Sequence, residues 1–234
     1  MRINKVLFGF IITLFFSATL NAQSGYSTQY YGDGIMRSEG ALEEGLEEGE
    51  WRYYYPEGEL NAVFTFLHGV QEGVTTHYYP NGNEKSVEIF KADKLEGVAT
   101  HFYPNGNVKK KGLYFQDQYP GEWTYFYETG ELKRKGVYRF GLLDGEWSVY
   151  YLSGKLDYKV AYSKGKKNGS YIRYYENGEK FEEGQYILDI KTGYWVFYHV
   201  NGRKQMEGQY KRDEKIGKWT EYHKSGKEKG KVKY

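Results

Sequence analysis

Gly145-Glu-Trp147-Ser-Val-Tyr150-Tyr151-Leu-Ser-Gly154-Lys-Leu156 is the stretch that decides the fold, and Tyr162 completes its pattern. It is typical of a short β-strand, a glycine turn and a second strand. The leading glycine recurs every 24 residues, at Gly25, Gly49, Gly73, Gly97, Gly121, Gly145, Gly169, Gly193 and Gly217. The turn glycine keeps the same step, from Gly34 to Gly226. A fixed period over nine units without insertions indicates a repeat architecture.

Aromatic residues hold fixed places when each unit is numbered from its leading glycine as position 0. Position 5 is aromatic in every unit, position 6 is Tyr until it becomes His199 and His223, and position 17 is Phe or Tyr from Phe66 to Tyr234. Position 2 holds every tryptophan of the chain: Trp51, Trp123, Trp147, Trp195 and Trp219. Strict alternation puts positions 2, 4 and 6 on one face and position 5 on the other. Either a bulge re-aims one set, or a partner or curvature covers one face.

Turn residues divide each unit into two strands. Asn-Gly pairs such as Asn81-Gly82 and Asn177-Gly178 favour a hairpin turn with positive φ at both central residues. A polar link such as Ser163 to Asn168 predicts a second turn between units. We therefore predict an all-β fold for residues 23–234: an elongated single sheet or solenoid of about nine stacked antiparallel β-hairpins, spanning roughly 85 Å at ~4.8 Å per strand.

Residues 1–22 have the features of a secretory signal peptide, with basic Arg2 and Lys5 before an apolar run. We expect cleavage ahead of Gln23 and a mature protein that is periplasmic, on the outer surface or secreted, without stable membrane insertion. Removing the two basic residues leaves 31 basic and 31 acidic of the original 33 and 31, which argues against nucleic acid as a partner. The chain has no cysteine, so we expect neither disulfides nor thiolate metal sites.

The frame Gly-x-Trp-x-x-Tyr-Tyr-x-x-Gly resembles the MORN-repeat variant of bacterial proteins. Clear instances run from Gly121 to Tyr138, Gly145 to Tyr162 and Gly193 to Tyr210, and the resemblance covers about residues 25–234. It implies an elongated sheet of stacked hairpins used for scaffolding and protein binding. Some members are described as antitoxin components, which makes an antitoxin-like inhibitor of a protein an alternative function.

The sequence favours a non-enzymatic protein without catalytic residues, cofactor or metal. It contains no cysteine nucleophile, no Gly-x-Ser-x-Gly elbow and no phosphate-binding glycine loop. His77 and His101 both occupy position 4, one repeat and about 10 Å apart, which is far for two ligands of one ion. We interpret these histidines as replacements for tyrosine on a half-exposed sheet.

Our candidate binding surface combines departures from the repeat, where copies differ, with tryptophans of the aromatic ladder. It comprises Thr75, His77, Ala99, His101, Trp123, Trp147, Trp195 and Trp219. We expect an unknown protein as the partner, with a cell-surface polysaccharide stacking on the aromatic ladder as the alternative. Residues 32–60 carry nine acidic and two basic residues, whereas residues 203–234 carry five acidic and eleven basic ones. This asymmetry predicts either two solvated ends or self-association through them.

Overall fold

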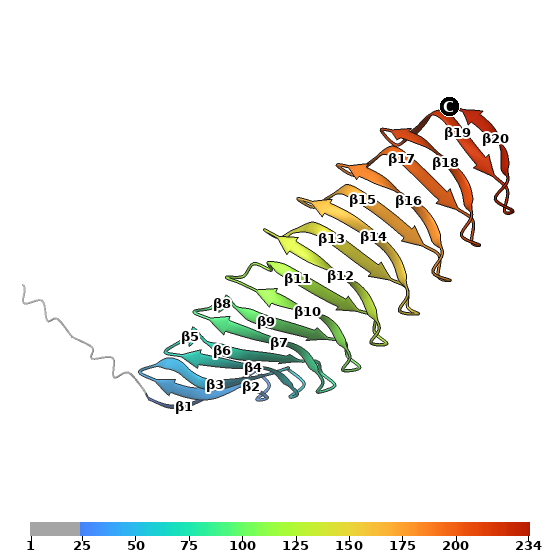
Figure 1. The fold of residues 1–234 in the computed structure, drawn as a ribbon. Coiled ribbons are helices and arrows are strands. Elements are labelled where there is room, and N and C mark those ends of the chain that lie inside the picture. Colours follow the sequence, from blue (N-terminus) through green and yellow to red (C-terminus); the bar gives the residue numbers. More distant parts are fainter. Residues whose placement is uncertain (1–23) are drawn as a thin grey trace, which may run out of the picture.

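The computed structural model describes residues 24–234, and the predicted signal peptide at residues 1–22 lies outside that range. Figure 1 shows β-hairpins stacked one behind another along a single axis. The strands of the first five units are β1 (Gly25–Tyr30), β2 (Met36–Glu43), β3 (Leu46–Tyr54), β4 (Leu60–Leu67), β5 (Val70–Gln71), β6 (Gly73–Tyr78), β7 (Glu84–Lys91), β8 (Lys94–Leu95), β9 (Gly97–Phe102), β10 (Val108–Tyr114), β11 (Gly121–Phe126) and β12 (Leu132–Arg139). Those of the last four are β13 (Leu142–Tyr150), β14 (Leu156–Ser163), β15 (Lys166–Tyr174), β16 (Lys180–Ile187), β17 (Ile190–Tyr198), β18 (Lys204–Lys211), β19 (Glu214–Tyr222) and β20 (Glu228–Lys233).

All twenty strands belong to one antiparallel sheet, and each pairs with its neighbours in the sequence. The short strand β5 is followed by β6, and both pair with β4. In the same way β8 and β9 both pair with β7, so β5–β6 and β8–β9 each act as one interrupted strand. The prediction of stacked antiparallel hairpins with a 24-residue repeat is therefore confirmed. Within residues 24–234 there is no helix that could cross a membrane.

The Asn-Gly turns differ from the prediction. Gly82 has φ +84°, but Asn81 is not in the left-handed region, so positive φ at both residues is wrong here. The loop is longer than a two-residue hairpin: Tyr79 N donates to Asn83 O at 2.8 Å, and Gly82 N donates to Tyr79 O at 2.9 Å. A turn of this length needs only its last residue, the glycine, in the left-handed region.

The turns between units carry the paired positive φ angles instead. At Lys164-Gly165 the two φ values are +50° and +82°, and at Leu188-Asp189 they are +50° and +72°. Two consecutive left-handed residues form the tight hairpin turn that matches the twist of the flanking strands. The polar link of the sequence is therefore a two-residue turn, and strands such as β13 and β15 reach 9 residues.

Two bulges decide which side chains share a face. Gly40 pairs with Trp51 while Ala41 pairs with Glu48, so the leading glycine Gly49 lies in a bulge of β3. A second bulge lies where Tyr53 pairs with Ala62 but Tyr54 pairs with Leu60. Positions 2, 4, 13, 15 and 17 thereby share one face, which we call the Trp face. Position 5 lies on the opposite face, which we call the outer face.

Packing on the Trp face depends on a third glycine series, at position 15. A Cβ on Gly184 would lie 2.3 Å from carbons of the Trp195 ring, so only glycine admits the indole. Ring pairs between units add edge-to-face contacts, such as Tyr186 to Trp195 at 5.3 Å and 88°. The same close approach recurs wherever the next unit has tryptophan: Gly40 with Trp51, Gly112 with Trp123, Gly136 with Trp147 and Gly208 with Trp219.

Position 6 links each hairpin to the next. The hydroxyl of Tyr151 donates to the carbonyl of Tyr174, 23 residues later, at 2.7 Å. Where the tyrosine gives way to His199, its Nε2 lies 3.1 Å from the carbonyl oxygen of Tyr222. The same bond is made by Tyr31, Tyr55, Tyr79, Tyr103, Tyr127 and Tyr175. These tyrosines form a ladder that fixes the spacing of the hairpins.

Candidate binding site

The aromatic packing of the Trp face is interrupted in the Gly73 and Gly97 units. Thr75 and Ala99 replace tryptophan, and both are fully buried. The residues opposite them at position 15 are Phe64 and Glu88 rather than glycine. Phe64 fills the space that an indole would take, with its ring 5.4 Å from the ring of His77. A small residue at position 2 therefore accompanies a large one at position 15.

Glu88 lies between the two histidines that the sequence singled out. Its carboxylate oxygens are 3.9 Å from His77 Nε2 and 3.5 Å from His101 Nε2, and its side chain is mostly buried. The two histidines are thus brought together through a carboxylate that the sequence reasoning had not considered. The signal for it was present, because Glu88 is the one acidic residue at position 15 in the chain.

Burial determines the charge of these imidazoles. Burial, with the positive charges of Lys110 and Lys109, lowers the pKa of His101 to about 4. Burial also lowers the pKa of His77, against the opposing effect of Glu88. Both rings are therefore neutral at pH 7. Glu88 thus lies beside two neutral rings, and it opposes the lowering effect of burial on the pKa of Lys110.

The four tryptophans of the candidate surface are core residues in the structure. Trp123, Trp147, Trp195 and Trp219 are between 0 and 3% exposed. Their ring faces are covered by neighbouring tyrosines and by basic side chains, such as Lys191 Nζ, which lies 4.1 Å from the Trp195 ring centre. Trp147, Trp195 and Trp219 therefore offer no ring face on which a ligand could stack in this conformation.

Trp123 differs from the other tryptophans in its indole N–H. Trp51 and Trp147 donate Nε1 to the carbonyls of Ala41 and Val137, at 2.9 and 3.0 Å. Trp195 and Trp219 also donate to backbone carbonyls, whereas the buried Nε1 of Trp123 has no partner in residues 24–234. Pairing of β10 with β11 stops at Gly112 and Trp123, just after Pro120, which has no N–H to extend it.

Trp123 also borders a small cavity, which we call the Trp123 pocket. Its volume is about 210 Å³. It is lined by Lys110, Tyr114, Tyr119, Trp123, Tyr125 and Tyr138. Lys110 Nζ lies 5.2 Å from the Trp123 ring centre. The pocket thus combines aromatic walls with one half-buried ammonium group.

The outer face of the same units carries an exposed aliphatic stripe. Val74 pairs with Ile89, and Val98 pairs with Leu113, on the adjacent strands β6, β7, β9 and β10. These four side chains are 49, 38, 58 and 44% exposed. Sequence reasoning missed this stripe because it attended to positions 2 and 4 rather than to positions 1 and 16.

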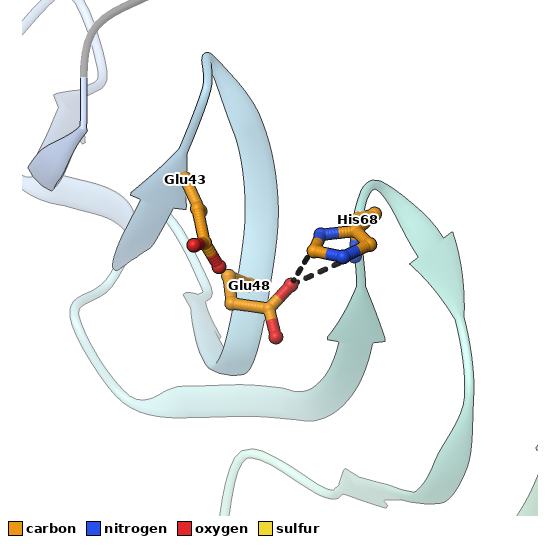
Figure 2. A group of neighbouring side chains, drawn as sticks. All are labelled: Glu43, Glu48 and His68. Carbon is orange, nitrogen blue, oxygen red and sulfur yellow. Dashed lines mark hydrogen bonds and ion pairs between the residues drawn. The ribbon is translucent and has the colours of Figure 1, made fainter.

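A group with the ligand types of a metal site lies elsewhere, at a turn between units. Figure 2 shows Glu43, Glu48 and His68, whose ligand atoms lie within 4.8 Å of one another. Glu48 already accepts the backbone N–H of His68 at 2.7 Å, and the ring Nδ1 lies 3.4 Å away. The equivalent carboxylates of later units make the same backbone bond without histidine, as Glu72 does with Ala92 N. Glu48 therefore acts as a turn cap, and we assign no ion to this group.

The repeats assign the chain to a protein family. The MORN repeat variant model matches residues 47–68, 71–91, 95–116, 119–139, 143–164 and 167–187. These segments cover more than half of the sequence and follow the hairpins one by one. The chain belongs to the MORN repeat variant family. No curated protein matches it.

Solved structures with similar hairpin arrays are distant. One is the wild-type TCP10 domain of Danio rerio CPAP in complex with a peptide of Danio rerio STIL, with 14% identity, a TM-score of 0.30, and coverage of 90% of this chain and all of that one. Another is TcdB2-TccC3-Cdc42, with 11% identity, a TM-score of 0.19, and coverage of 85% of this chain and 14% of that one. Neither likeness carries an argument about function.

Proposed function

We propose that this protein is an exported, non-enzymatic repeat scaffold that binds another protein across its sheet. The observation that supports a protein partner is the aliphatic stripe of Val74, Ile89, Val98 and Leu113 on the outer face. Contiguous exposed aliphatic side chains are a feature of protein interfaces, whereas sugar rings stack on exposed aromatic faces. The tryptophans that would supply such faces are buried.

The stripe is specific to these two units. Only these two units have aliphatic side chains at both positions in residues 24–234, whereas the others carry pairs such as Glu50 with Thr65, Glu122 with Val137 and Tyr194 with Gln209. Because the backbone is the same throughout, the change of side chains is what distinguishes this segment as an interface. Export rests on the predicted signal peptide, and N-terminal sequencing of the native protein is expected to begin at Gln23.

Co-purification from the native envelope with a matched pair of variants tests the proposal. Val98→Glu places a charge in the stripe, and Ser170→Glu places the same charge at the same repeat position of another unit. We expect a stoichiometric protein to copurify with the parent and with Ser170→Glu, and to be lost with Val98→Glu. If the protein instead stays bound to insoluble polysaccharide, and Val98→Glu does not weaken that binding, the glycan function would be favoured. That result would contradict the proposal of a protein partner.

A further inference from the structure

Two basic triplets lie one repeat apart in the middle of the chain. Lys109–Lys111 is on β10 and Lys133–Lys135 is on β12, with β11 between them. At the middle of each triplet, Lys110 and Arg134 both pair with Tyr125 of β11, so both lie on the Trp face. The Arg134 guanidinium lies 4.2 Å from the centre of the Tyr125 ring. The sheet thus brings two cations to either side of one aromatic residue.

These side chains line a concavity beside the Trp123 pocket. The concavity has a volume of about 360 Å³ and is lined by Tyr103, Lys109, Lys110, Tyr125, Phe126, Lys133 and Arg134. It shares Lys110 and Tyr125 with the Trp123 pocket, and we call the two together the basic groove. Neither lining includes an aspartate or glutamate. Every charged side chain in the lining is therefore basic, which complements an anion, while Glu88 lies outside the lining and acts on Lys110 and Tyr114 from there.

Hydrogen-bond donors of the residues that line the Trp123 pocket lack acceptors. The indole N–H of Trp123 is buried and has no partner in residues 24–234. Lys110 forms no ion pair within 4.0 Å in the described part of the chain, and Glu88 acts on it only from a greater distance. Tyr125 and Tyr138 share one hydrogen bond of 3.1 Å between their hydroxyls, so one of the two protons is left to donate. An unmet buried donor is costly, and a group that only accepts hydrogen bonds would satisfy it.

The dimensions of the groove select the ligand. The Trp123 pocket, at about 210 Å³, is smaller than the ~300–1,000 Å³ of typical small-molecule sites. It has room for one side-chain-sized group, while the neighbouring concavity has room for the chain that carries it. Nucleic acid bases need an exposed ring to stack on, and the Trp123 ring is only 2% exposed. A carboxylate on a peptide fits both the size and the donors.

We infer that the basic groove binds an acidic segment of the protein partner, with one aspartate or glutamate carboxylate entering the Trp123 pocket. The inference rests on the proposed function and adds the chemistry of the partner. It places Lys110, Arg134 and Trp123 on the Trp face of β9–β12 as the recognition residues, while the aliphatic stripe lies on the outer face of strands that overlap these. A partner that reaches around the sheet would contact both.

Titration of the full mature chain with synthetic peptides tests the groove without the natural partner. The probes are an N-acetylated, C-amidated peptide with six consecutive glutamates and the same peptide with six glutamines. The readouts are isothermal calorimetry and the five indole N–H signals in ¹H–¹⁵N NMR, with that of Trp123 assigned from Trp123→Phe. We expect saturable binding of the glutamate peptide that moves the Trp123 signal and leaves the other four in place.

Charge-matched variants distinguish binding in the basic groove from general electrostatic attraction between the peptide and the protein. Lys110→Gln with Arg134→Gln is expected to weaken the glutamate peptide at least about tenfold, whereas Lys211→Gln, an exposed basic site on β18, changes it less than twofold. Circular dichroism of each variant verifies folding. Equal binding of the glutamine peptide, an unmoved Trp123 signal, equal losses with Lys211→Gln, or tighter binding of oligouridylate at the same site would each overturn the inference. None of these results would affect the test of the aliphatic stripe.

Discussion

The Gly73 and Gly97 units and the Gly193 and Gly217 units share one backbone but use their Trp faces differently. In the later units tryptophan at position 2 packs on glycine at position 15 of the preceding unit, and the rings form a continuous core. In the earlier units Thr75 and Ala99 leave room for Phe64 and Glu88, and polar groups replace the rings. Hydrogen bonds of the sheet thus hold the repeat together while position 2 decides whether a unit contributes mainly stability or a polar surface.

Truncation of an indole is expected to have the largest effect. Trp195→Ala removes a fully buried ring from the core cluster, which costs about 3–5 kcal/mol in such positions. Thr75→Ala at the same repeat position removes one hydrogen bond, from Gln71 Nε2 at 2.7 Å, and is expected to cost about 1 kcal/mol. Urea unfolding followed by circular dichroism compares them, and equal losses would abolish the distinction between the two regions.

A methyl group added at position 15 is expected to have the next largest effect. In Gly184→Ala the new Cβ meets Trp195 ring carbons at 2.3 Å, and overpacking of this kind costs about 1–3 kcal/mol or more. Combining it with Trp195→Thr removes the ring that the new methyl group meets. We therefore expect the double variant to be more stable than the sum of the two single losses predicts. Strict additivity in denaturant melts would show that the contact is not the cause.

Acid is expected to destabilise the polar units more than the aromatic ones. Because burial lowers the pKa of His101 to about 4, the unfolded chain binds a proton that the folded chain does not, between that value and the ordinary pKa near 6.5. Protonation of this histidine therefore does not change the free energy of unfolding above about pH 6.5. As the pH falls toward 4, it lowers the free energy of unfolding by roughly 2 kcal/mol. His101→Gln should flatten this part of the stability profile. An unchanged slope in thermal melts from pH 7 to 4.5 would contradict the role of His101.

Removal of one rung of the tyrosine ladder is expected to have the smallest effect, and one that is alike in both regions. Tyr151→Phe deletes the hydroxyl that donates to the Tyr174 carbonyl, at a cost of about 1 kcal/mol. Tyr79→Phe deletes the same bond to Phe102 in the polar region and should cost as much. Tyr150→Phe is the control, because within residues 24–234 that hydroxyl forms no hydrogen bond to another hairpin. A loss confined to one region would show that the ladder is not uniform.

The sequence was sufficient to predict the period, the strands and the stacking, because the Asn-Gly turns and the aromatic positions repeat in register. It was insufficient for the two-residue turns between units, since residues as different as Lys164 and Leu188 adopt the same left-handed conformation there. The pairing of Gly184 with Trp195 was missed because the two belong to different units, and only comparison across units shows that one accompanies the other.

The candidate site was predicted in part. His77 and His101 do lie on one face, but Glu88 between them emerged only from the cross-strand register. The unpartnered indole of Trp123 depends on how Pro120 shortens a strand pair, which no local pattern reveals. The basic triplets were visible in the sequence and were overlooked because charge was counted at the two ends.

Pairing of every strand with its neighbours in the sequence has a mechanical consequence. Tension applied to the two ends is expected to peel hairpins from the stack one at a time, because the strands of residues 24–234 pair only with strands adjacent along the sequence. Each rupture releases 24 residues, about 80 Å of extended chain at ~3.4 Å per residue. The protein would thus lengthen under load in equal increments, as an extensible tether with a built-in step size.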